Sequence, residues 1–202
     1  MDLTGWKQKH RERNRYNRTA HIYDLRYQEE QRSKYKIILN GLNLDPTSSI
    51  MDIGCGTGLL LSELRGVKEI VGLDISREML QRAKRSASSI DNTHLLLADA
   101  DHAPLRSNHF DLVFAITLLQ NMPSPPSTLQ EIIRITKANA SIAISVMQIH
   151  FPEDCFAKLL KASRMRAKLV TEGDNIKCHI AICKKDVETG RYPSNLPGKE
   201  QI

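Results

Sequence analysis

Short apolar runs alternate with segments of helical periodicity along this chain. Continuous apolar runs such as residues 70–73 and 112–116 are typical of buried strands, because a strand covered on both faces has no polar side. Strands are predicted at residues 49–53, 69–74, 93–98, 110–116 and 141–147. Helices are predicted at residues 29–40, 59–65, 76–88, 127–136 and 153–163, where apolar positions recur at helical spacing or a helix-capping residue opens the segment.

This order of elements predicts an α/β fold, with a doubly wound, mostly parallel sheet covered by helices on both faces. Two further strands are predicted at residues 168–171 and 176–183. The connection between them is too short for a parallel crossover, so we expect a hairpin in which one strand runs antiparallel. The domain organisation that follows is a basic arm at residues 1–20, partly mobile or loosely helical, one domain at 21–184, and a disordered tail at 185–202.

Composition narrows the class of protein. The 202 residues are 41% hydrophobic, which suits one globular domain. There is no apolar run long enough to predict a membrane span, and residues 1–7 lack the apolar core of a signal peptide. Four scattered cysteines are typical of a reducing cytoplasm, where we expect the protein to reside. The seven histidines show no metal-ligand spacing, so no metal site is predicted.

Positive charge is concentrated in two segments of a chain whose net charge is +6. Residues 1–18 carry six basic side chains against Asp2 and Glu12, and a second basic cluster lies at residues 158–168. Basic patches attract phosphate-rich partners, so the arm could bind RNA. The alternative is that both segments are ordinary solvated faces.

A turn with three glycines follows the first predicted strand. Gly54, Gly56 and Gly58 alternate with Cys55 and Thr57. Dinucleotide-binding proteins carry G-x-G-x-x-G, but here the third glycine position is Leu59. A phosphate-binding P-loop needs a lysine after its last glycine, which is also missing. The turn therefore favours a ligand other than a pyrophosphate or a triphosphate.

Three predicted strands carry aspartates at their carboxyl ends, namely Asp52, Asp74 and Asp99. Asp74 lies 20 residues after Gly54, the separation at which a carboxylate accepts hydrogen bonds from ribose hydroxyls. Each aspartate alone could be a loop cap. Together they favour a nucleoside ligand that lacks phosphates and carries positive charge.

Four blocks in this order resemble the class I S-adenosylmethionine-dependent methyltransferases, in particular the small branch called type 11. The blocks are residues 52–58, 72–80, 98–100 and 110–113. The resemblance extends over about residues 20–184 and implies a seven-stranded Rossmann-like sheet with an antiparallel last strand and an N-terminal helical lid. In that branch, a Tyr-Asp pair matching Tyr23 and Asp24 often covers the cofactor.

The resemblance also implies roles for individual residues toward S-adenosylmethionine. Asp74 would bind the ribose, Ile75 and Met79 would pack on the adenine, and Asp99 would accept from its exocyclic amine. The remaining implied contacts, which surround the amino-acid part, the adenine edge and the sulfonium, are Tyr23, Asp52, Gly54, Cys55, Gly56, Ala100 and Ala115.

No catalytic residue stands out, and methyl transfer can proceed largely by positioning of an activated methyl group. Gln120 and Asn121 lie where many relatives have histidines, and they could orient a substrate or simply cap the loop. Residues 137–140 replace the usual Pro-Gly-Gly turn, and Asn139 is expected to adopt its left-handed conformation. The Asn-Pro-Pro-aromatic motif of exocyclic-amine methylation is missing.

The predicted activity is therefore methyl transfer to an unassigned acceptor. RNA such as tRNA is modestly favoured by the basic arm, and a small metabolite or lipid is the alternative. Because the chain has no long insertion for substrate recognition, an activator subunit is a further possibility. A cofactor-binding module that acts through a partner without catalysis is a further option. The last is a different nucleoside enzyme on the same fold, such as an aminopropyl-transfer relative, which the lack of an acidic polyamine-pocket signature disfavours.

Overall fold

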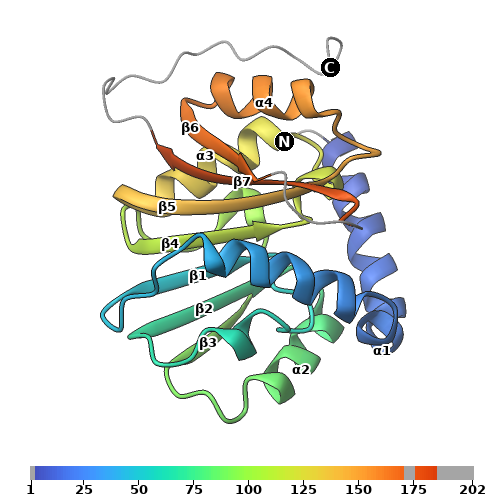
Figure 1. Cartoon of the computed structure of the whole chain (residues 1–202). Coiled ribbons are helices and arrows are strands. Elements are labelled where there is room, and N and C mark those ends of the chain that lie inside the picture. The colour runs from blue at the N-terminus through green and yellow to red at the C-terminus, as the bar shows by residue number, and fades with distance from the viewer. Residues whose placement is uncertain (1–2, 171–175, 186–202) are drawn as a thin grey trace.

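The computed structural model describes residues 3–170 and 176–185. Their core is a seven-stranded sheet in the order β3-β2-β1-β4-β5-β7-β6 (Figure 1). The strands are β1 (Ser49–Ile53), β2 (Glu69–Asp74), β3 (Thr93–Leu97), β4 (Phe110–Ile116), β5 (Thr136–Met147), β6 (Met165–Val170) and β7 (Cys178–Lys185). β1 to β5 pair in parallel, and β7 is antiparallel to both β5 and β6. The predicted sheet and its closing hairpin are confirmed.

Helices cover both faces of this sheet. The helices are α1 (Leu3–Asn40), α2 (Arg77–Ser86), α3 (Pro125–Ile135) and α4 (Glu153–Ala162). The apolar sides of α3 and α4 pack on one face, and the carboxyl-terminal part of α1 packs on the other with the turn after β1. Side chains of β1 alternate between the two cores, with Met51 and Ile53 in one and Ile50 in the other. Burial on both faces explains why the strands are continuously apolar.

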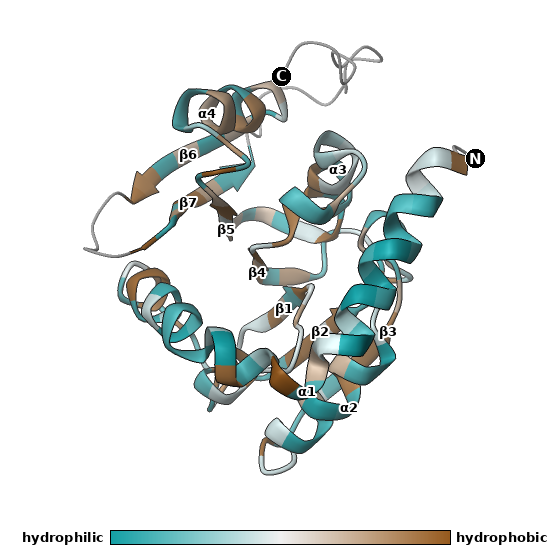
Figure 2. Ribbon diagram, turned by 90° about the vertical axis from the view of Figure 1, so that its right-hand side faces the viewer, coloured by the Kyte–Doolittle hydropathy of each residue, from teal (hydrophilic) through white to brown (hydrophobic). Residues whose placement is uncertain are grey.

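α1 is much longer than predicted. The sequence predicted a helix at residues 29–40, whereas α1 has 38 residues and begins at Leu3. It changes direction near its middle, so that its two parts contact different sides of the domain (Figure 1). Most of its length is hydrophilic (Figure 2). The predicted boundary at residue 20 falls inside this helix, and the predicted tail lies, apart from Lys185, outside the described residues.

The helix predicted at residues 59–65 is wrong. Only one turn of 3-10 helix forms there, at Leu61–Glu63. Gly58 and Gly66 flank this segment with positive φ angles of 78° and 77°, which leaves too few residues for a stable helix. Its leucines nevertheless fill the core beside α1, because Leu60, Leu61 and Leu64 are all buried.

Two local predictions are confirmed. Ser76 caps α2 by accepting a hydrogen bond from the backbone N–H of Met79, at 3.2 Å. Asn139 has the predicted positive φ, at 64°, although residues 137–140 belong to β5, whose pairing with β4 shifts register there, and do not form a separate turn. Among the helices that the structure describes, none is both long enough and apolar enough to cross a bilayer.

Candidate functional site

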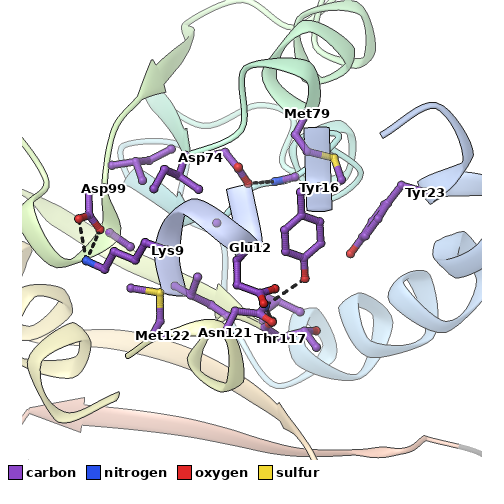
Figure 3. Close-up of a pocket in the computed structure, with 17 residues that line it drawn as sticks. Lys9, Glu12, Tyr16, Tyr23, Asp74, Met79, Asp99, Thr117, Asn121 and Met122 are labelled. Atoms are coloured by element: carbon purple, nitrogen blue, oxygen red, sulfur yellow. Dashed lines mark hydrogen bonds and ion pairs between the residues drawn. The ribbon is translucent and has the colours of Figure 1, made fainter. Parts of the chain in front are cut away.

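A pocket lies at the carboxyl ends of the central strands, beneath the amino-terminal part of α1 (Figure 3). Seventeen residues line it: Lys9, Glu12, Tyr16, Tyr23, Gly54, Gly56, Leu73, Asp74, Ile75, Met79, Asp99, Ala100, Ile116, Thr117, Leu118, Asn121 and Met122. We call it the strand-end pocket. The order of parallel strands brings the ends of β1, β2 and β4 together here, as expected for an open α/β sheet. Eight of the eleven predicted cofactor contacts line it.

The glycine turn forms one wall of this pocket. Gly54, Gly56 and Gly58 all have positive φ, at 81°, 55° and 78°, a region that strains any other residue. A Cβ on Gly58 would lie 2.9 Å from the Cα of Ala83 in α2. Gly58 therefore permits the close packing of turn and helix that the third glycine provides in dinucleotide-binding proteins.

Asp74 holds the turn and the start of α2 together. One carboxylate oxygen accepts from the N–H of Gly56 at 2.9 Å, and the other accepts from the N–H of Ser76 at 2.8 Å. Burial raises the pKa of Asp74, and these backbone hydrogen bonds oppose that effect. Ile75 and Met79 line the pocket beside it, as the resemblance implied.

Asp52 lies in a smaller adjoining pocket with Tyr23, Gln31, Tyr35 and Cys55. The residue is 3% exposed. Burial, with a smaller contribution from the negative charge of Asp74, raises the pKa of Asp52 to about 8. A buried carboxyl of this kind gains most from a cationic ligand, since a nearby positive charge stabilises its ionised form. Cys55 belongs to this pocket, where burial raises the pKa of its thiol well above the usual range.

Asp99 already has a cationic partner. The ammonium group of Lys9 lies 2.7 and 2.6 Å from the two carboxylate oxygens of Asp99, and 2.6 Å from one oxygen of Asp101 (Figure 3). Asp99 also accepts from the N–H of Asp101. The residue implied to bind an exocyclic amine is thus arranged to accept from an amino group. Ala100 lines the pocket next to it.

Three side chains of α1 that sequence reasoning missed complete the rim. Tyr16 accepts a hydrogen bond from the side chain of Asn121 at 3.0 Å, and burial raises its pKa. Asn17 accepts one from the hydroxyl of Ser76 at 2.6 Å. Glu12 lines the pocket directly. The only sequence signal was that positions 9, 12 and 16, which line the pocket, share one face of a helix. Asn17 lies beside the pocket and is not part of its lining.

The loop after β4, which includes Thr117 and Asn121, lies between the strand-end pocket and a second pocket. Thr117 has a φ of 58°, which is strained for a β-branched residue. The side-chain amides of Gln120 and Asn121 both donate to its carbonyl oxygen, at 2.7 and 3.2 Å, so both cap the loop. Ala115, which was predicted to contact the cofactor, lies in the core and lines none of the three pockets. The next three residues, Ile116, Thr117 and Leu118, line the strand-end pocket.

The second pocket, which we call the acceptor-side pocket, adjoins the first. It is lined by Arg15, Tyr16, Thr19, Ile22, Tyr23, Arg26, Tyr27, Glu30, Gln31, Lys34, Thr117, Gln120, Asn121, Met147 and His150. Tyr16, Tyr23, Thr117 and Asn121 line both pockets. The acceptor-side pocket holds about 1030 Å³ including the solvent at its mouth, which is room for a small organic molecule.

Comparison with known proteins shows the family to which this chain belongs. The methyltransferase domain family matches residues 44–191. The chain belongs to this family. Solved structures that share its fold include several S-adenosylmethionine-dependent methyltransferases, one of them with bound S-adenosylmethionine. S-adenosylmethionine is therefore the cofactor of this methyltransferase domain.

Two curated relatives show what the domain is similar to. Malonyl-[acyl-carrier protein] O-methyltransferase from Marinomonas is 32% identical over 72% of this chain and 55% of its own length. Demethylmenaquinone methyltransferase from Staphylococcus epidermidis is 31% identical over 63% of this chain and 54% of its own length. The chain thus spans about half the length of the curated relatives it matches.

A solved structure matches over most of the fold. It is the complex between the Haloferax volcanii Trm112 methyltransferase activator and a methyltransferase, with a TM-score of 0.76. The match is 18% identical and covers 84% of this chain and 96% of that chain. At this identity the likeness concerns the fold.

The residues of the strand-end pocket, together with Asp52 in the smaller adjoining pocket, fit S-adenosylmethionine. The buried carboxyl of Asp52 lacks a hydrogen bond from any side-chain cation in the part of the chain that the structure describes, and the cofactor carries an ammonium group. No atom lies within 4 Å of a Cβ built on Gly56, so the turn leaves open space beside the carboxylate of Asp74. Asp74 lines the strand-end pocket and Asp52 the adjoining one, and their carboxyl groups suit a ligand that carries positive charge.

Proposed function

We propose that the protein transfers the methyl group of S-adenosylmethionine to a small organic acceptor. The observation that carries this proposal is that the two pockets adjoin, because four residues line both of them. A cofactor in the strand-end pocket and an acceptor in the acceptor-side pocket meet at Thr117. Holding two reactants in line in this way supplies about 7–11 kcal/mol of barrier reduction.

Within the strand-end pocket, each side chain has a separate role toward the cofactor. Asp74 binds the ribose hydroxyls, and Ile75 and Met79 pack on the adenine. Asp99 accepts from the adenine amine beside Ala100, once the ammonium group of Lys9 shares or leaves its carboxylate. These assignments rest on the strand-end position of each residue and on the pocket that they line.

The amino-acid part of the cofactor lies toward the glycine turn in this proposal. The backbone of Gly54 and Gly56 approaches it, and the carboxyl of Asp52 pairs with its ammonium group. Tyr23 separates this region from the acceptor, since it lines the strand-end pocket, the acceptor-side pocket and the smaller pocket that contains Asp52. Its hydroxyl accepts from Gln31 at 3.3 Å, which fixes the orientation of the ring.

A small acceptor is favoured over RNA. The curated relatives named above act, by their names, on malonyl-[acyl-carrier protein] and on demethylmenaquinone. Two basic residues of the arm that suggested RNA have partners inside the domain. Lys9 pairs with Asp99, and Arg15 donates to the side-chain oxygen of Asn121 at 3.2 Å while it also pairs with Glu12 of the same helix. The charge that motivated the RNA hypothesis is therefore partly used for packing α1. A requirement for an activator subunit stays a prediction.

The test uses methyl-tritiated S-adenosylmethionine with the purified chain and three separate acceptor pools. These pools are total RNA, total protein, and a cell extract freed of macromolecules by ultrafiltration. We expect label in the ultrafiltered pool. Label that ribonuclease removes would show that RNA is the acceptor. Binding of the cofactor without transfer to any pool would favour a non-catalytic module.

A further inference from the structure

The acceptor-side pocket contains a buried cation that the cofactor does not use. The side chain of Lys34, in the second part of α1, is 1% exposed and lines this pocket. Its ammonium nitrogen lies 2.8 Å from a carboxylate oxygen of Glu30 and donates to the hydroxyl of Thr117 at 3.3 Å. A lysine buried to this degree is rare, because removing its charge from water is costly without good partners.

The hydroxyl group of Thr117 can still donate a hydrogen bond. Lys34 donates to its oxygen, so the proton of the hydroxyl is free for another acceptor, and none of the described residues takes it. The strained backbone at this position is held by the N–H of Thr117, which donates to both the carbonyl and the hydroxyl of Ser145 at 2.9 and 3.0 Å. Strain that the surroundings maintain in this way is typical of functional positions. Here it holds the hydroxyl at the junction of the two pockets.

The charge of the pocket wall favours an anionic ligand. The lining contains three cationic side chains, Arg15, Arg26 and Lys34, and one carboxylate, Glu30. Arg15 also pairs with Glu12, which lies outside this lining, at 2.6 Å, so the local balance is three cations to two carboxylates. Glu30 is 34% exposed, so its pairing with Lys34 leaves the inner side of the ammonium group directed toward Thr117.

We propose that the methyl acceptor is an organic anion whose reactive group is an anionic oxygen, bound by Lys34 and by the hydroxyl of Thr117. This inference rests on the proposed function and names its substrate class. The acceptor oxygen supplies the electron pair of the new O–C bond. The C–S bond of the cofactor breaks, and its electron pair stays on sulfur, so the anionic oxygen and the sulfonium both become neutral. No proton moves, which accounts for a site with amides and without a general base.

The first experiment identifies the charge of the acceptor. The ultrafiltered cell extract is separated by anion exchange at neutral pH, and each fraction is incubated with the protein and methyl-tritiated S-adenosylmethionine. We expect label only from the retained fraction. Release of labelled methanol by alkali identifies a carboxylate acceptor, and alkali-stable label identifies a phenolate or enolate. Label from the unretained fraction, or none from the retained one, overturns the inference.

The second experiment tests Lys34 itself. Lys34→Met removes the charge at similar length, Lys34→Arg retains it, and Lys36→Met is the matched control on an exposed position of the same helix. A hydrogen bond from a charged donor is worth about a 10- to 100-fold change. We therefore expect Lys34→Met to lower kcat/KM for the acceptor by that factor, with KM for S-adenosylmethionine unchanged. We expect Lys34→Arg to recover part of the loss, and equal rates for Lys34→Met and Lys36→Met contradict the role.

A further pair of variants covers the case in which Lys34→Met does not fold. Thr117→Ala and Thr117→Ser leave the pair between Lys34 and Glu30 in place, and they differ only in the hydroxyl. Thr117→Ser should retain more activity than Thr117→Ala, and equal activity of the two speaks against the hydroxyl. Different results would contradict the proposed function and the inference about the acceptor. Without binding of S-adenosylmethionine the proposed function falls, whereas binding with transfer only to neutral or cationic molecules removes this inference alone.

Discussion

The ammonium nitrogen of Lys9 lies 2.6 Å from a carboxylate oxygen of Asp99, although the two residues are 90 positions apart in the chain. Lys9 belongs to the amino-terminal part of α1, and Asp99 follows β3. The side chains are 9% and 18% exposed, so the pair is largely shielded from solvent. This contact attaches α1 to the rim of the strand-end pocket, at the position where the adenine amine is expected to bind.

The Lys9 contact should make a measurable contribution to stability. Lys9→Met leaves Asp99 and Asp101 close together without a cation, and breaking a buried pair in this way costs about 3–5 kcal/mol. Because Asp99 keeps some exposure, we expect the lower end of that range in urea unfolding. Lys7→Met, at an exposed position of the same helix, is the control. Equal unfolding free energies for the two variants would show that the pair does not stabilise α1.

The glycines of the turn should differ in their tolerance of alanine. At Gly56 a Cβ meets no atom within 4 Å, so Gly56→Ala carries only the strain of a φ of 55°, about 1–2 kcal/mol. At Gly58 a Cβ would clash with the backbone of Ala83 in addition. We expect Gly58→Ala to destabilise the protein by about 1–3 kcal/mol more than Gly56→Ala, which is the usual cost of overpacking. Thermal unfolding of both variants measures the difference, and a smaller loss at Gly58 contradicts the packing described for it.

Cofactor affinity should depend on pH through Asp52. In the free protein its pKa is about 8, so the carboxyl is protonated at neutral pH. The ammonium group of the cofactor favours the carboxylate, so binding lowers this pKa and releases a proton. Affinity should therefore rise as pH increases from about 6 to 8, by at most about tenfold per pH unit. Above that range the amine of the cofactor, whose pKa is about 8, loses its own charge.

Calorimetric titration in two buffers of different ionisation enthalpy counts the protons released. Asp74 is also buried with a raised pKa, so Asp52→Asn is needed to isolate the effect of Asp52. We expect this variant to bind the cofactor more weakly and with little dependence on pH. A wild-type affinity that is constant over this range, with no proton release, would exclude the proposed pairing of Asp52.

The sheet and the strand-end residues could be predicted because their signals are local. A buried parallel strand is a continuous apolar run, and the turn after β1 is specified by three glycines that adopt positive φ. Asp74 could be assigned to the pocket by counting from Gly54. Ala115 could not be excluded in the same way, because adjacent residues at the end of β4 alternate between the core and the pocket.

The role of α1 could not be predicted, because it depends on contacts between distant parts of the chain. Its amino-terminal part is hydrophilic, and the burial of Lys9 becomes clear only when Asp99 and Asp101 are placed opposite it. The helix predicted at residues 59–65 was wrong for a related reason. Three consecutive leucines indicate burial, but burial in a glycine-flanked turn satisfies them as well as a helix does.

Binding of S-adenosylmethionine at the end of β2 is the central claim, and equilibrium dialysis of wild type against Asp74→Ala tests it most directly. The matched control is Asp91→Ala, an exposed aspartate before β3. We expect one cofactor per chain for wild type and for Asp91→Ala. For Asp74→Ala we expect an affinity at least about 100-fold lower, because two hydrogen bonds to a charged group are lost. Equal affinity of Asp74→Ala and wild type, or no binding by wild type, would contradict the account.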